Sequence, residues 1–181
     1  MSIEQSEFDA LRATIRERGT ARIWLFFAGV TSWAAVSLGA AALSLPPVGT
    51  VLPLLILAAA FEGVYALHVG VERIGRYLQA RAEGSNTVSR NVTWETTIMA
   101  FGRPKGSARV DALFSTIFII AGICNVIPAL GVLVGGATPA ELVFVGGVHA
   151  LFIARVLYAR SVAARQRDID LARFKELSNV D

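Results

Sequence analysis

Cysteine is almost absent from this chain of 181 residues, and charged residues are scarce. Because Cys124 is the one cysteine, the sequence excludes an intramolecular disulfide and the Cys-x-x-Cys pair of thiol oxidoreductases. Only 17% of the residues are charged, whereas soluble domains carry about 25%. Hydrophobic residues make up 54% of the chain, so the composition argues against a water-soluble fold.

The sequence also lacks the motifs of several large enzyme classes. It contains no Walker loop, no His-Glu-x-x-His metalloprotease helix, no Gly-x-Ser-x-Gly elbow and no dinucleotide-binding fingerprint. The glycines of residues 70–76 follow an apolar segment rather than a strand, and their spacing differs from that fingerprint. The sequence therefore predicts neither a hydrolase nor an ATP-driven pump, and it offers no catalytic residues and no metal site.

Long apolar segments fill most of the remaining sequence. Runs of about 18 or more apolar residues indicate membrane spans. We expect four such spans, near residues 23–45, 53–70, 110–134 and 139–157. Prolines and glycines interrupt the chain between the first two spans and between the last two. The predicted fold is an all-α integral membrane protein, a four-transmembrane-helix bundle built from two helical hairpins.

The first span has an alternative interpretation as a cleaved secretory signal, because Ala40, Ala41 and Ala42 offer small residues for cleavage. Its apolar run is longer than the roughly 7 to 15 residues of a signal core. A permanent membrane anchor is therefore preferred. At the fourth span, Thr138, Pro139 and Glu141 form a capping-box pattern that predicts a helix start.

Lysine and arginine positions predict the orientation of the spans. All 17 lie within residues 12–22, 73–109 and 155–175, and the two hairpin tips contain none. Because cytoplasmic loops collect basic residues, we expect both termini on the cytoplasmic side of a cell membrane, the inner membrane in a bacterium. The expected domains are a cytoplasmic amphipathic segment, a four-helix membrane domain with a cytoplasmic loop, and a cytoplasmic C-terminal helix. They cover residues 1–22, 23–157 with the loop at 71–109, and 158–181.

The net charge of +3 points to a membrane surface rather than nucleic acid, because the basic residues flank apolar spans. Candidate contacts for lipid phosphate or another anion are Arg73, Arg76, Arg155 and Arg160, at the cytoplasmic ends of the second and fourth spans. Ordinary anchoring by basic residues is the favoured interpretation of the same four arginines. The predicted partner is thus a bilayer with anionic lipids on its cytoplasmic side.

Polar residues inside the spans are the best candidates for a functional site, because such groups are costly in lipid. Counting from the expected helix starts, at about 1.5 Å per residue, places Glu62, Asn125 and His149 about 14 to 15 Å deep. Tyr65 lies on the same helix face as Glu62, and His68 lies nearer the cytoplasm. Small neighbouring residues favour an inward orientation, so these five residues form the candidate intramembrane polar site.

The polar site has two interpretations. The first span offers Trp33 or Ser37 to it, and Pro128 is expected to kink the third helix and free a backbone carbonyl. In the structural interpretation, a protonated Glu62 hydrogen-bonds neighbouring helices and fixes the bundle. In the functional interpretation, Glu62 and His149 belong to a proton relay, an ion site or a cofactor pocket.

Haem is the cofactor that the two histidines bring into question. His68 and His149 are its only candidate axial ligands, but their expected heights differ by about 7.5 Å along the helix axes. The sequence therefore leaves the cofactor unknown and ranks a haem or quinone redox protein third. A membrane binding or assembly component, as a homo-oligomer or accessory subunit, ranks first. A small proton- or ion-coupled transporter, channel or sensor ranks second.

Overall fold

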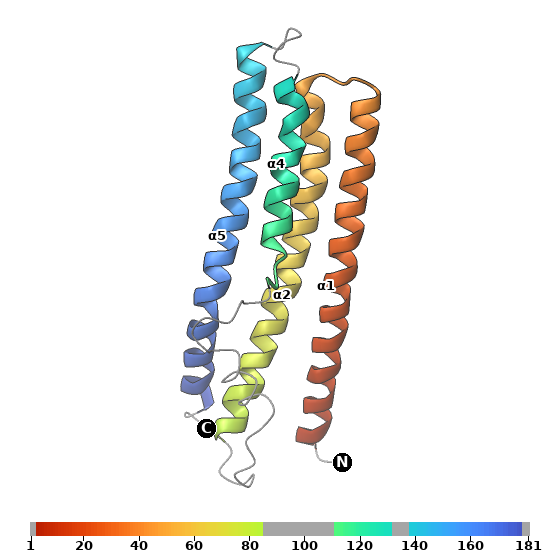
Figure 1. Cartoon of the computed structure of the whole chain (residues 1–181). Helices are drawn as coiled ribbons and strands as arrows, with labels where there is room; N and C mark the ends of the chain where they lie inside the picture. Colours follow the sequence, from red (N-terminus) through yellow and green to blue (C-terminus); the bar gives the residue numbers. More distant parts are fainter. Residues whose placement is uncertain (1–2, 85–110, 132–137, 179–181) are drawn as a thin grey trace. The chain divides into compact units, whose positions relative to one another are not determined.

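The computed structural model describes residues 3–84, 111–131 and 138–178, and within these ranges the chain is helical with no strand (Figure 1). The elements are α1 (Ile3–Ala42), the short 3-10 helix η1 (Pro47–Thr50), α2 (Val51–Gly84), α4 (Ser115–Gly131) and α5 (Pro139–Ser178). The prediction of an all-α protein is confirmed. Most of the expected cytoplasmic loop and the tip before the fourth span lie outside the described residues.

Three of the helices, α1, α2 and α5, are long and apolar enough to cross a membrane, and α4 is a shorter apolar helix. They are helices of the membrane-protein kind and are compatible with a membrane location. Their lengths are 40, 34 and 40 residues, whereas a bilayer core needs about 20. Each therefore continues well beyond its expected span. The number of spans and the cytoplasmic placement of both termini stay predictions.

The chain divides into two compact units, which are described separately. One contains residues 21–66 and 111–161 and is called the apolar unit. The other contains the described parts of residues 1–20, 67–110 and 162–181 and is called the charged unit. α1, α2 and α5 each contribute to both units, because no proline separates their apolar and charged segments.

Aromatic rings form the centre of the apolar unit, where the four helices run side by side (Figure 1). Each helix supplies one buried phenylalanine: Phe26, Phe61, Phe118 and Phe152. The Phe61 ring lies 5.2 Å from the Phe118 ring and 6.5 Å from the Phe152 ring, both edge to face. Since lipid tails are as apolar as these rings, close packing rather than the hydrophobic effect holds such helices together.

Small residues allow the helices to approach. Gly29 of α1 lies against Ala60 of α2, and Gly63 of α2 lies under the Leu25 side chain, so an added methyl group at either glycine would collide. These contacts hold α1 and α2 together as small-residue interfaces do in membrane proteins.

The end of α1 is fixed by a Schellman motif. Ser44 has a positive φ of 51°, its amide donates to the Ala41 carbonyl, and the Leu45 amide donates to the Ala40 carbonyl. Glycine is the usual residue at the left-handed position because it has no Cβ. Pro46 and Pro47 follow and prevent the helix from continuing, and η1 begins at Pro47.

The start of α4 is fixed by Asp111. Its carboxylate accepts hydrogen bonds from the Thr116 amide at 2.9 Å and from the Ser115 hydroxyl at 3.1 Å. Phe114 has a φ of 51° and stacks on Phe26 with ring centroids 4.1 Å apart. Because a short polar side chain competes with the backbone in this way, α4 begins at Ser115, later than the expected start of the third span near residue 110.

The start of α5 contains the predicted N-cap. The Glu141 amide donates to the Thr138 hydroxyl at 3.3 Å, and Pro139 occupies the first helical position. The Glu141 carboxylate was expected to bond back to the cap of its own helix. It accepts a hydrogen bond from the Val48 amide at 3.1 Å and thereby ties η1 to α5.

Candidate functional site

A buried asparagine lies at the centre of the polar site in the apolar unit. Asn125 of α4 is 3% exposed. Its Oδ1 accepts hydrogen bonds from Trp33 Nε1 at 3.0 Å and from Ser37 Oγ at 3.4 Å. Its Nδ2 donates to the Thr50 carbonyl at 2.8 Å and lies 2.9 Å from His149 Nε2. These five residues, the Asn125 cluster, use all the hydrogen-bonding capacity of the amide.

The partners fix both the amide orientation and the histidine tautomer. The Trp33 indole can only donate and the Thr50 carbonyl can only accept, so the oxygen and nitrogen of Asn125 cannot be exchanged. His149 Nε2 must then accept from Nδ2, and His149 Nδ1 donates to the Val145 carbonyl at 2.7 Å. His149 is therefore neutral, with its proton on Nδ1. A proton on Nε2 would eliminate the bond to Asn125.

Glu62 and Tyr65 lie in a second polar group of the apolar unit. Arg155 of α5 donates to Glu62 at 2.8 Å, and its guanidinium lies 5.1 Å from the centroid of the Tyr65 ring. The side chains of Glu62 and Arg155 are 48% and 38% exposed. The expected polar layer is thus divided: Asn125 and His149 lie together with the residues offered by the first span, and Glu62 lies elsewhere.

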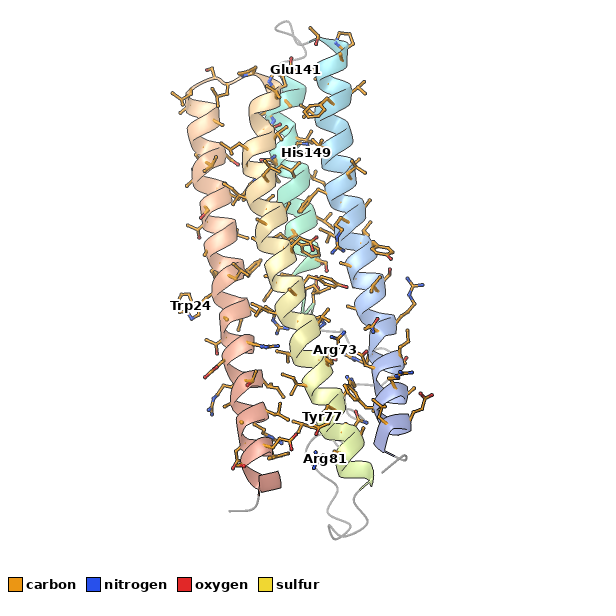
Figure 2. All side chains as sticks on the ribbon, turned by 180° about the vertical axis from the view of Figure 1, so that it is seen from behind. Trp24, Arg73, Tyr77, Arg81, Glu141 and His149 are labelled. Carbon is orange, nitrogen blue, oxygen red and sulfur yellow. The ribbon has the colours of Figure 1, made fainter. Side chains whose placement is uncertain are left out.

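A difference in helix register explains this division. Counting from Pro53 and Pro139 assumes that α2 and α5 begin at the same height. Instead, Asn125 joins His149 to Thr50, immediately before α2 begins. Glu62 is about 18 Å further along α2 at 1.5 Å per residue. Figure 2 shows Glu141 near the start of α5 and His149 further along the same helix.

The face of α2 that carries Glu62 points away from the core. The buried side chains of α2 in this unit include Leu57, Phe61 and Val64, all at 0% exposure. The opposite side forms a row of exposed residues, called the α2 outer stripe: Leu52, Leu55, Ala59, Glu62 and Ala66. Ala59 and Ala66, two of the small residues expected to mark an inward face, therefore lie on the outside.

A cavity of about 310 Å³ lies beside the Asn125 cluster and is called the α1–α4 cavity. Buried residues, including Pro53 and Ala129, form its floor, whereas exposed residues of α1 and α4 form its rim. Its lining consists of Trp33, Ser37, Ala40, Ala41, Ser44, Leu45, Pro46, Pro47, Gly49, Thr50, Pro53, Cys124, Asn125, Pro128 and Ala129. The cavity was not predicted, because a void depends on side chains from several helices.

The interior of the charged unit is built around Arg76, which is 1% exposed. Its guanidinium donates to Glu72 at 2.9 Å and to Gln79 at 3.0 Å, and Arg167 of α5 donates to Glu72 at 3.1 Å. Glu72 lies beyond the apolar segment that ends at Gly70. Burial raises the pKa of its carboxyl, but Arg167 and Arg76 outweigh burial and hold that pKa below the ordinary value.

A second group in the charged unit joins its helices. The Tyr77 hydroxyl of α2 donates to Glu7 of α1 at 2.8 Å, and the Tyr77 ring lies 5.7 Å from the Phe174 ring of α5. Arg81 also pairs with Glu7, at 3.4 Å. Tyr77 and Arg81 are labelled on α2 in Figure 2. Here the helices are joined by polar side chains as well as by ring packing.

Carboxylates pair with three of the four arginines predicted to contact anions. Arg73 lies 3.8 Å from Asp170, Arg76 bonds Glu72, and Arg155 bonds Glu62. Arg160 is exposed on α5. The i, i+4 spacing of Glu72 and Arg76 predicts their pair, whereas the other two pairings were not predicted.

The histidines lie in different units: His149 in the apolar unit, and His68, 7% exposed, in the charged unit. Because both nitrogens of His149 are hydrogen-bonded, an iron at this imidazole would displace Asn125 or the Val145 carbonyl. Within residues 3–84, 111–131 and 138–178, no three His, Cys, Asp or Glu side chains are grouped as metal ligands would be.

No protein-family model matches the chain, and no curated protein or solved structure is detectably similar to it.

Proposed function

We propose that this chain is a multi-pass structural subunit of a membrane assembly and that two copies associate through the α2 outer stripe and Arg155. The observation that carries the proposal is the ion pair between Glu62 and Arg155. It lies in the apolar unit, yet its two side chains are 48% and 38% exposed. A charged pair on the outside of an apolar helical unit would be stabilised by a protein partner that covers it.

The surroundings of the Glu62–Arg155 pair determine its energy. In water, an exposed ion pair contributes only about 0 to 1 kcal/mol. In a bilayer, a charged side chain at the centre of a helix costs about 2.5 to 3.5 kcal/mol on insertion scales. Glu62 is about 12 Å along the helix from Gly70, where the expected span ends. Its short side chain cannot reach the head groups from there, so a covering protein surface would lower this cost.

The outer stripe has the geometry of a helix-packing seam. Its residues follow one another at spacings of three and four, the pattern of helices that pack along their length. Ala59 and Ala66 precede and follow Glu62 on the stripe, and small residues at such positions allow another helix to approach closely. The ion pair would therefore lie in the middle of the contact.

A second copy is the partner that fits the pair best. A two-fold axis along the membrane normal places each Glu62 at the depth of its counterpart, so charges of opposite sign meet without any further adjustment. Arg155 has five N–H donors in a planar fork, and donors not used within its own chain can bond the partner copy's carboxylate. The patch is thus complementary to itself.

Charge reversal with complementation tests the proposal. Glu62→Arg and Arg155→Glu each place like charges together. We expect the wild type to form dimers in nanodiscs and each variant alone to be monomeric. Light scattering or energy transfer between labelled copies measures the oligomeric state. Mixing the two variants should restore dimers, because each supplies the charge that the other lacks. Glu17→Arg, an exposed reversal on α1, is the matched control and should remain dimeric.

Helix content by circular dichroism shows whether each variant is folded. If both folded single variants dimerise as the wild type does, or if mixing restores nothing, the assembly proposal is wrong.

The alternatives have less support from the geometry. A proton relay needs Glu62 and His149 near each other, but Glu62 bonds Arg155 and His149 bonds Asn125 at a different height of the apolar unit. A haem would have to break the hydrogen bonds of His149. Both alternatives stay predictions of lower rank.

A further inference from the structure

The α1–α4 cavity has the volume of a ligand pocket. Its volume of about 310 Å³ falls at the lower end of the range of ligand pockets, roughly 300 to 1,000 Å³. Protein interiors are close-packed, and voids larger than a water molecule are few. The cavity therefore calls for an occupant larger than water.

The walls of the cavity cannot collapse to fill it. Four prolines contribute to the lining: Pro46, Pro47, Pro53 and Pro128. Their rings fix the backbone and have almost no rotamer freedom. Ala40, Ala41 and Ala129 form further parts of the wall, and a methyl group cannot reach into an empty space. The sequence thus keeps the cavity open.

Four polar side chains of the lining are already hydrogen-bonded within the protein, namely those of Trp33, Ser37, Thr50 and Asn125. Trp33 Nε1 donates to Asn125, and the Thr50 hydroxyl donates to the Pro47 carbonyl at 2.7 Å. Asn125 has no hydrogen-bonding capacity left, because all its positions are filled. A polar occupant would lose its hydration without gaining equivalent partners, so the chemistry of the cavity favours hydrocarbon.

The mouth of the cavity is surrounded by exposed apolar side chains. Ala41 and Cys124 are exposed rim residues on α1 and α4. On the same two helices, Leu38 is 72% exposed and Ile127 is 57% exposed. An opening of this kind is accessible from the hydrocarbon region of a bilayer.

We propose that the α1–α4 cavity holds a hydrocarbon chain of a bilayer lipid, inserted between α1 and α4. The chain fills the space that prolines and alanines leave open, next to the indole of Trp33. This proposal does not depend on self-association, because the cavity residues and the α2 outer stripe are different parts of the apolar unit.

Fluorescence quenching by brominated lipid tests the proposal, because bromine quenches tryptophan on close contact. Trp24→Phe and Trp94→Phe leave Trp33 as the only tryptophan, and this parent protein is reconstituted in phosphatidylcholine with brominated acyl chains. Ala129→Leu and, separately, Ala41→Leu then fill the cavity from its floor and its rim. We expect each to reduce quenching of Trp33 on the order of twofold, because the added side chain occupies the volume of the lipid chain. Ala150→Leu, exposed on α5 and outside the cavity, should change nothing.

The single cysteine allows a second measurement without a substitution in the core. N-octylmaleimide on Cys124 introduces an alkyl chain at the rim and should also reduce quenching, whereas N-methylmaleimide should not. If Trp33 is quenched equally in the parent, the two filling variants and the octyl-labelled protein, the cavity does not hold a lipid chain.

Discussion

Replacing Asn125 by leucine removes the residue on which four helical segments converge. Leucine has a similar size but no polar atoms, so Trp33 Nε1, the Thr50 carbonyl and His149 Nε2 each lose a strong partner. Hydrogen bonds between membrane helices contribute about 0.6 kcal/mol on average and about 1.7 at most. Three such losses, with their donors and acceptors left in an apolar interior, predict a free energy of unfolding lower by about 2 to 4 kcal/mol.

Steric trapping in bicelles measures this free energy of unfolding for membrane proteins. Ser37→Ala is the matched control, because the Ser37 bond to Asn125 is long, at 3.4 Å, and its loss should cost under about 0.5 kcal/mol. In a double-mutant cycle, the double variant Trp33→Phe/Asn125→Leu should lose less free energy of unfolding than the sum of the two single variants. The reason is that both substitutions remove the same hydrogen bond. If the free energy of unfolding of Asn125→Leu is within about 0.5 kcal/mol of the wild-type value, the Asn125 cluster does not hold the helices together.

Three further predictions concern the packing, the turn and the charged unit. Gly29→Ala places a methyl group in collision with the Ala60 side chain and should lower the free energy of unfolding by about 1 to 3 kcal/mol; an unchanged value would contradict the packing described. Ser44→Gly removes a Cβ from a left-handed position and should raise the same free energy by about 1 kcal/mol; a decrease would show that the hydroxyl matters more than the backbone. Because the folded-state pKa of Glu72 is lowered from about 4.5, its contribution to stability should be complete above that pH and disappear as the pH falls below it. Thermal unfolding of wild type and Glu72→Gln should therefore converge in acid, and a constant difference at all pH values would refute this.

The helical fold and most members of the Asn125 cluster could be predicted from the sequence, because the chain has few polar residues inside its apolar segments. Apolar runs of this length have no other stable form in lipid. Asn125, His149, Trp33 and Ser37 are polar groups in apolar segments, and such groups are satisfied by one another. Hydrogen bonds join Trp33, Ser37 and His149 to Asn125 in the structure.

The outward orientation of Glu62 could not be predicted from the sequence. Alanine occupies positions 58, 59, 60 and 66 of α2, so small residues lie on several faces of the helix and do not mark the packed one. The partner of Glu62 was hidden too, because Arg155 was assigned to the end of the fourth span. Only the register of α2 against α5, set by contacts through α4, brings the two charges together.

The continuation of the helices beyond the expected spans also depends on tertiary contacts. No proline stops a helix at residues 22, 70 or 157, and α2 continues through Gly70. Pairs such as Glu72 with Arg167 and Glu7 with Tyr77 join neighbouring helices in the charged unit. These pairs connect residues far apart in sequence, so periodicity alone does not predict them.

Cysteine crosslinking in native membranes tests the central claim most directly. In a Cys124→Ser background, Ala59→Cys places a thiol on the α2 outer stripe, and Leu38→Cys places a thiol at an exposed position of α1. Self-association through the stripe predicts that oxidation converts Ala59→Cys to disulfide-linked dimers while Leu38→Cys stays monomeric. Monomeric Ala59→Cys, or equal crosslinking at both positions, would contradict the account.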